Sequence, residues 1–492
     1  MANNILIIHG YSDGAQSFTI LRDFFVKEGL YSAENVSYVS YASLEDTACF
    51  QDFSDKLDED YTRLYGQGRI DVACHSTGSL VVRAWLQMRL IRQVANGQPI
   101  ASPVEHLLSF APANFGSDLA LMGQSFLQKF RMTFSPNMRS GDAFQSGKIV
   151  LEDLEPASPF QWDLSVDDLH GETYFSPDLP PERACYPFIF AAGNRPTGIV
   201  ADLVPGQRKL GTDGTVRICG TSLNTRKCNV NFSKNEVTPI WVRETKFPNI
   251  PYSVFNGFNH GSLVQSNLKA FTDPDGPAAL VRTALAVKNH SDYGAAAVTF
   301  QATSERNYQA IRQSDEEEAK PFQQFFFRIV DDTGLEVTDY FIDFHVLTQD
   351  NSVDADLTSL FDKTFNADIH THSANSACRV MMIDCGNLEG FAQRIIAAKG
   401  KVVFDITGCS AVPNVDFVQG HCVVFDGANP NPPGPSFLFP NTTTLVEVTL
   451  VRKESDALLC LLDSDLKPLA LLAEPDKTPP RLTGRARLLP QQ

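Results

Sequence analysis

The stretch DVACHSTGSLVVRAW, residues 71–85, decides the fold of this chain. An apolar strand, Ile70 to Cys74, leads directly into Ser76, and a helical pattern begins right after it. A nucleophile elbow has this form, with an exposed serine on a sharp turn and small residues two positions before and after it. Cys74 and Gly78 take these places, which gives C-x-S-x-G. The alternative is that Ser76 only caps the helix, because serine is a favoured N-cap.

Strands and helices alternate on both sides of this turn. Helical patterns at 18–30, 50–68 and 79–94 follow or precede apolar strands at 5–8, 70–74, 106–113 and 188–193. This alternation predicts a mostly parallel sheet with right-handed crossovers. Between residues 117 and 186 the pattern changes, and apolar residues recur at helical spacing (Leu119, Met122, Phe126 and Phe130). We expect a lid-like insertion over the sheet here, the alternative being a helix that simply packs on it.

The last third of the chain has a different character. Short strand-like segments are separated by Gly, Asn, Pro and Asp turns, which is typical of a β-sandwich or a small barrel. The sequence therefore predicts an α/β domain over residues 1–290 and a mainly-β, sandwich-like domain of unknown role over 300–480. The strand-like segments are 322–332, 339–349, 377–386, 401–408, 421–427 and 442–453, and one helix is predicted at 388–400.

Bulk properties exclude several classes of function. The 492 residues are too many for one ordinary core, and the net charge of −17 makes nucleic acid an unfavourable partner. Acidic balance also opposes charge-driven adsorption to anionic membranes, so transient contact with a lipid surface would have to be hydrophobic. The start, MANNILIIHG, lacks a basic n-region and a cleavage site, and no apolar run is long enough to span a bilayer. We expect a cytoplasmic chain, with signal-independent export left open and the oligomeric state unknown.

Cysteine and histidine patterns give no metal prediction. The ten cysteines contain no C-x-x-C pair, so reduced thiols are expected, although Cys219 and Cys228 are close enough in sequence to form a disulfide. His370 and His372 would share one face of a strand, but no further ligands accompany them. The acidic run 315–318 reads as a solvated stretch. The sequence therefore predicts neither a metal nor a cofactor.

Three further signals accompany the serine. The first strand ends in His9-Gly10, where the backbone N–H groups of Tyr11 and of Thr77, the residue after the serine, are the expected oxyanion donors. Asp213 lies in the turn of KLGTDGTVRICG (209–220), and His260 lies in the loop of GFNHGSLVQ (257–265). Each has an ordinary alternative: a glycine-rich turn, an Asp-Gly turn and a solvated loop histidine. Together, Ser76, Asp213 and His260 follow the Ser–acid–His order of α/β-hydrolases.

Residues 1 to about 270 resemble the lipase-like α/β-hydrolases, which include bacterial triacylglycerol lipases, PGAP1-like and LCAT-like acyl hydrolases and some lipase effectors of type VI secretion. This resemblance implies the α/β-hydrolase fold and an insertion that selects acyl chain length. The family usually has Gly or Ala where this chain has Cys74. The matching positions are His9-Gly10-Tyr11 for the oxyanion loop, His75-Ser76-Thr77-Gly78 for the elbow, 112–117 (PANFGS) for the Pro- and Gly-Ser-containing segment after the next strand, Asp213-Gly214 for the acid turn and His260 for the histidine loop.

The sequence thus predicts a serine hydrolase that cleaves carboxylic esters, with Ser76, His260 and Asp213 as a triad and a small-molecule or lipid ester as substrate. A phospholipase or a thioesterase would use the same triad, because the pocket and not the triad sets the bond that is cleaved. A third alternative is a catalytically silent hydrolase-like domain whose β domain binds a partner.

Overall fold

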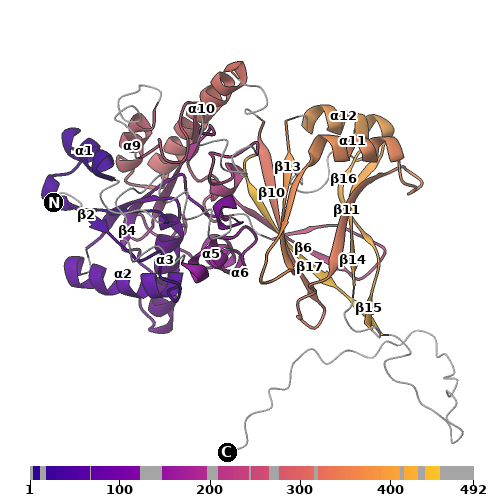
Figure 1. The fold of residues 1–492 in the computed structure, drawn as a ribbon, viewed down its shortest axis with the longest axis horizontal. Helices are drawn as coiled ribbons and strands as arrows, with labels where there is room; N and C mark the ends of the chain where they lie inside the picture. Colours follow the sequence, from indigo (N-terminus) through magenta and orange to yellow (C-terminus); the bar gives the residue numbers. More distant parts are fainter. Residues whose placement is uncertain are drawn as a thin grey trace, which may run out of the picture.

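The computed structural model describes residues 4–11, 18–66, 68–121, 147–196, 209–242, 245–264, 276–314, 320–386, 388–409, 415–429 and 438–454. Figure 1 shows an α/β part, coloured indigo to rose, beside a β-rich part in orange and yellow. One large apolar core fills the α/β part, and a second core lies in the β-rich part.

A parallel sheet of six strands forms the centre of the α/β part. Its central strands are apolar on both faces, as strands covered by helices on both sides must be. All five strand pairings are parallel, so the carboxyl ends of the strands meet at one edge. In spatial order the strands are β2 (Val36–Val39), β1 (Asn4–Ile8), β3 (Ile70–His75), β4 (Val104–Phe110), β5 (Tyr186–Ala192) and β9 (Tyr252–Phe255).

Helices cover the two faces of this sheet (Figure 1). The helix α2 packs against α3 on one face, and α10 packs against β9 on the other. Periodic apolar residues explain the packing of α2, whose buried side chains include Phe50, Phe53 and Leu57 at i, i+3 and i+7. The helices are α1 (Thr19–Lys27), α2 (Phe50–Tyr65), α3 (Gly78–Ala95), α5 (Lys148–Leu154), α6 (Pro159–Ser165), α9 (Ala278–Leu285) and α10 (His290–Ser314).

The β-rich part consists of two larger sheets that share one core, with α11 (Ala355–Phe365) and α12 (Leu388–Ala398) at one end. Together with the parallel sheet, this confirms the predicted fold class. The six-stranded sheet has the order β12 (Asn366–Thr371), β13 (Cys378–Asp384), β10 (Phe322–Asp331), β17 (Thr443–Leu450), β6 (Arg226–Phe232), β8 (Ile240–Val242). The four-stranded sheet has the order β11 (Tyr340–Leu347), β14 (Lys401–Gly408), β16 (His421–Asp426), β7 (Glu236–Val237), and β15 (Val415–Phe417) pairs with β18 (Arg452–Glu454).

Two segments cross the domain boundary expected at residues 290–300. Strands β6, β7 and β8 come from residues 226–242 but belong to the sheets of the β-rich part, where β6 pairs with β17, β7 with β16, and β8 with β6. In the other direction, α10 begins at His290 yet buries Tyr293 and Phe300 in the core of the α/β part. Hydrophobic pattern alone does not reveal such exchanges, because a strand or helix looks the same whichever core it joins. The division into 1–290 and 300–480 stays a prediction.

The described part of the expected insertion, residues 117–121 and 147–186, is folded into the α/β core. Its helix α6 buries Trp162 and Leu164, and a buried ion pair joins Asp168 to Arg83 of α3 at 2.7 Å. Met122, Phe126 and Phe130 lie outside the described residues. The lid therefore stays a prediction for its central portion.

Two sequence expectations concern a possible disulfide and a possible membrane-spanning segment. Cys219 and Cys228, the pair that proximity left open, are both buried free thiols. Among the described helices, none combines the length and the apolar composition needed to cross a bilayer. The acidic run 315–318 and the chain end from residue 455 onward lie outside the described residues.

Candidate active site

Ser76 occupies the sharp turn between β3 and α3. Its φ is +54°, which a residue with a side chain rarely adopts and which a tight turn enforces here. The N–H of Ser76 donates to the Phe110 carbonyl at 3.1 Å, and the Ser76 carbonyl accepts from the Ala113 N–H at 3.2 Å. The end of β4 thus fixes the backbone of the elbow on both sides.

The two small positions of the elbow have different roles. A Cβ at Gly78 would lie 2.7 Å from the His9 carbonyl oxygen, so α3 approaches the end of β1 as closely as only glycine allows. Cys74 is buried in β3 between Ile8 and Ser109, and its Sγ lies 3.4 Å from the Ser109 hydroxyl. The departure from the usual Gly or Ala is therefore accommodated inside the sheet.

Ser76, His260 and Asp213 lie in hydrogen-bonding contact. Nε2 of His260 lies 3.0 Å from Oγ of Ser76, and Nδ1 of His260 lies 2.9 Å from Oδ2 of Asp213. The His260 backbone N–H also donates to the Asp213 carbonyl at 3.2 Å. Asp213 is buried and the imidazole is 14% exposed. Three residues distant in the sequence thus form one chain from carboxylate to hydroxyl.

The Asp213 carboxylate is held by its own turn. Its Oδ1 accepts the N–H groups of Thr215 and Val216, each at 2.9 Å, so that Oδ2 points at His260. With Nδ1–H donating to Oδ2, the neutral imidazole presents an unprotonated Nε2 to the serine, as a general base requires.

His75 supports the histidine loop. Its Nε2 lies 3.1 Å from the His260 carbonyl, and the two rings are 4.7 Å apart. Burial, followed by the neighbouring His260, holds the pKa of His75 well below its usual range. A neutral His75 therefore donates its Nε2–H to that carbonyl without adding charge beside the triad.

The end of β1 passes directly beside the serine. A Cβ at Gly10 would lie 2.9 Å from the Ser76 Cβ, which places the His9-Gly10-Tyr11 turn against the nucleophile. The His9 ring stacks on Tyr41 at 4.5 Å, accepts the Tyr41 N–H on Nε2 and donates from Nδ1 to the Gly10 carbonyl at 2.7 Å. Gly10, the residue before Tyr11, thus lies beside the Ser76 side chain, and the role of Tyr11 and Thr77 as oxyanion donors stays a prediction.

A buried polar network beneath the elbow was not predicted. The Ser79 hydroxyl contacts the Ser76 carbonyl and the Asn114 side chain, and Arg83 reaches Asn114 and Asp168. Ser79 and Arg83 lie four residues apart in α3 and therefore on one face of that helix, which is the signal that the sequence offers for this network. A buried arginine otherwise looks like a surface residue in a sequence.

The histidines of the H-x-H pattern contact the α/β part. Nε2 of His370 lies 2.7 Å from the Glu155 carboxylate, which also accepts from the N–H of Ser373 at 2.8 Å. Nε2 of His372 donates to the Glu152 carbonyl, because its Nδ1 accepts the Asn375 N–H. These contacts explain the pattern as a junction between the two parts.

Asp71, Glu105 and His106 bring three potential metal ligands together within 4.8 Å. Nδ1 of His106, however, lies 2.7 Å from Asp71, and its Nε2 lies 2.8 Å from the Val287 carbonyl. Both ring nitrogens are therefore engaged with protein oxygens, and the group ties β3 and β4 to the segment before α10.

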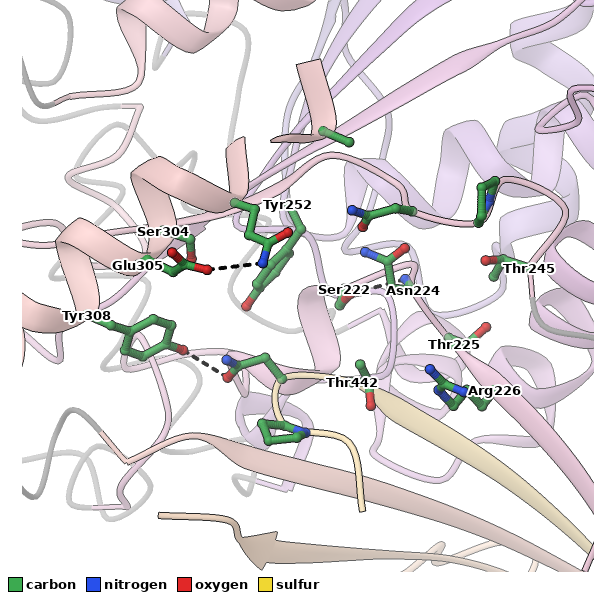
Figure 2. Close-up of a pocket in the computed structure, with 16 residues that line it drawn as sticks. Ser222, Asn224, Thr225, Arg226, Thr245, Tyr252, Ser304, Glu305, Tyr308 and Thr442 are labelled. Carbon is green, nitrogen blue, oxygen red and sulfur yellow. Dashed lines mark hydrogen bonds between the residues drawn. The ribbon is translucent and has the colours of Figure 1, made fainter. Parts of the chain in front are cut away.

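A cleft of about 380 Å³ lies where the two parts meet, shown in Figure 2. Hydroxyl and amide side chains from α10, the start of β6 and the 440–442 loop surround it, and several bond to one another, such as Tyr308 to Asn441 at 2.8 Å. None of Ser76, Asp213 and His260 lines this cleft.

Comparison with known proteins identifies structures that share the fold of this chain. No protein-family model and no curated protein sequence matches the chain. Phospholipase PlaB from Legionella pneumophila is 19% identical, with 95% of this chain and 97% of that chain covered and a TM-score of 0.72; its complex with thio-NAD gives 0.74. The mature lipase BlEst2 from Bacillus licheniformis is 13% identical over 55% of this chain and 89% of that chain, with a TM-score of 0.33. The chain therefore has the α/β-hydrolase fold with a β-rich C-terminal part, a fold that it shares with PlaB over nearly the whole length of both.

Proposed function

We propose that this protein is a serine hydrolase that cleaves carboxylic esters, with Ser76 as nucleophile, His260 as general base and Asp213 as the acid that orients His260. The observation that carries the proposal is the chain of contacts from Asp213 through His260 to Ser76, at 2.9 and 3.0 Å. A helix cap would explain the serine alone, but it would not explain an imidazole aligned between its hydroxyl and a buried carboxylate.

The proposed reaction has two stages, formation of an acyl-enzyme and its hydrolysis. Nε2 of His260 takes the proton of the Ser76 hydroxyl as Oγ attacks the ester carbonyl. The N–H groups of Tyr11 and Thr77 donate hydrogen bonds to the carbonyl oxygen and stabilise the negative charge that develops on it. The carbon–oxygen bond to the alcohol then breaks, the alcohol leaves with the proton from His260, and an acyl-serine remains. Water, deprotonated by His260, attacks the acyl carbon; the bond from that carbon to Oγ of Ser76 breaks, His260 returns the proton to Oγ, and the acid is released.

A phospholipid is the second candidate substrate. The likeness to a phospholipase extends over the C-terminal part as well as the α/β part. Phospholipids carry the same carboxylic ester bond, so the mechanism is unchanged.

The test is substrate hydrolysis by the wild-type protein and Ser76→Ala. We expect the wild type to release p-nitrophenol from p-nitrophenyl butyrate, and fatty acid from phosphatidylcholine vesicles if phospholipid is the substrate. An acyl-coenzyme A thioester tests the thioesterase alternative. A folded wild-type protein that turns over none of these, or a Ser76→Ala variant that keeps the activity, would overturn the proposal in favour of a binding module.

A further inference from the structure

The turn that carries Asp213 is a short closed structure. An isolated bridge joins Thr212 to Arg217, and the Ile218 N–H donates to the Gly211 carbonyl at 2.9 Å. Asp213 lies at the tip of this turn, toward His260, while Arg217 lies at its base. Because Oδ1 of Asp213 is bonded within the turn, the direction in which Oδ2 points depends on the position of the turn.

The base of the turn is bound by an ionic cluster that spans both parts of the protein. Arg217, only 8% exposed, lies 2.5 Å from the carboxylate of Asp368 on β12 and 3.1 Å from that of Asp118. Lys209 approaches the same two carboxylates, at 2.6 Å from Asp368 and 3.8 Å from Asp118. Two cations and two carboxylates thus balance, and one of the carboxylates belongs to the C-terminal six-stranded sheet.

Apolar contacts support the same side of the turn. Cys219 packs with Phe322 of β10 and Met382 of β13, and Leu210 packs against this cluster. A Cβ at Gly211 would lie 2.4 Å from the Phe322 ring, so the turn fits closely against the start of β10. On the other side, the Ser117 hydroxyl donates to the Thr215 carbonyl at 2.7 Å. The C-terminal six-stranded sheet therefore packs against one side of the turn that carries Asp213.

We propose that the C-terminal sheet positions the acid of the triad, through the ion pair from Asp368 to Arg217. Asp368 and Arg217 are positioning residues that touch no reacting atom, and the proposal rests on the proposed function of Ser76, His260 and Asp213. It assigns a role to the β-rich part: the part completes the active site and does not merely stabilise the core.

The test uses the full chain and a fluorophosphonate probe, whose rate of labelling at Ser76 reports how well the serine is activated. Asp368→Asn leaves Arg217 and Lys209 with one carboxylate. We expect the labelling rate to fall about 10- to 100-fold, because a displacement of a catalytic group that approaches 1 Å has an effect of this size. With p-nitrophenyl butyrate, kcat should fall while KM stays within about twofold, because no substrate contact is lost.

Asp163→Asn is the matched control. Asp163 of α6 pairs with Arg328 of β10 at 3.1 Å, so it also joins the two parts, but away from the acid turn and more exposed to solvent. We expect its labelling rate to stay within about twofold of the wild type. A purely structural role of Asp368 predicts that the two folded variants behave alike.

Combination with Asp213→Asn separates positioning from general destabilisation. If Asp368 acts through the acid, Asp368→Asn should slow labelling by less than about twofold in the Asp213→Asn background, because coupled residues are not additive. Circular dichroism and a thermal melt report folding. If Asp368→Asn does not fold, Arg217→Lys keeps the charge but loses the fork that serves two carboxylates, and we expect labelling about tenfold slower.

The outcomes keep the two proposals distinct. Suppose that the wild type is labelled at Ser76 but folded Asp368→Asn is labelled at the same rate as Asp163→Asn. The positioning role is then overturned, and the hydrolase proposal stands. The same conclusion follows if the effects of Asp368→Asn and Asp213→Asn on the labelling rate are fully additive. A folded Arg217→Lys that labels at the wild-type rate also overturns it. A folded wild type that is not labelled at Ser76 refutes the hydrolase, and the positioning role falls with it.

Discussion

Gly78→Ala tests how the elbow is built. The added Cβ would meet the His9 carbonyl oxygen at 2.7 Å and the Ile8 carbonyl oxygen at 3.0 Å, where ordinary contact begins at 3.4 Å. Both oxygens are backbone atoms at the end of β1, which is paired on both sides, so no flexible side chain can yield. Either α3 or the turn after β1 must move by up to about 0.7 Å.

Two effects follow from that movement. The free energy of unfolding should fall by about 1–3 kcal/mol, because an extra carbon atom in a close-packed region has a cost of this size. The same movement separates Thr77 from the His9-Gly10-Tyr11 turn, which the mechanism needs on either side of the oxyanion. We therefore expect kcat to fall about 10- to 100-fold even in the fraction that remains folded.

Gly294→Ala is the matched control, because Gly294 lies exposed in α10 with open space where its Cβ would be. In that helix, alanine should raise the free energy of unfolding by about 0.5–1 kcal/mol and leave turnover unchanged. Urea unfolding and p-nitrophenyl butyrate hydrolysis measure both quantities for the two variants. If Gly78→Ala equals the wild type in both, the close approach of α3 to β1 is not what shapes the elbow.

Further variants test single contacts. Asp213→Asn should keep its fold but lose about 10⁴-fold in kcat, because the imidazole is no longer held in the working tautomer; a loss under about tenfold would contradict this role. Cys74→Ala should cost about 1–2 kcal/mol of stability in urea unfolding and leave kcat within about twofold, whereas a large loss of kcat would mean that the sulfur shapes the elbow. Burial, followed by the neighbouring Glu152, raises the pKa of Asp153 to about 7. A pKa raised by folding means that the folded state binds the extra proton, so stability from this group is lost as pH rises from about 4 to 7. Asp153→Asn should therefore raise the melting temperature more at pH 8 than at pH 4, and an equal effect at both would refute the raised pKa.

Much of the fold was predictable from local pattern. Apolar runs and small residues that are adjacent in the sequence predict the strand at Ile70 and the helix at Gly78. The order Ser76, Asp213, His260 can also be read from the sequence, and the structure brings these three side chains together. Strand β9 was missed, because its four residues are too few to show a period.

Long-range partnerships were not predictable in the same way. Asp368 resembles any exposed strand residue until β12 is placed beside the acid turn, and Arg83 resembles a helix surface residue until Asp168 is placed opposite it. The H-x-H pattern had suggested a shared face for ligands, but Glu155 explains His370. Such roles depend on which segments meet, and a single sequence contains no local signal for that.

Labelling by a fluorophosphonate probe shows whether Ser76 is an activated nucleophile, because the probe reacts with an activated serine whatever the natural ester is. We expect that the wild type is labelled at Ser76, that Ser76→Ala is not, and that mass spectrometry places the adduct on the peptide that contains residues 71–85. A folded wild-type protein that remains unlabelled with and without detergent, or an adduct on another serine, would contradict this expectation.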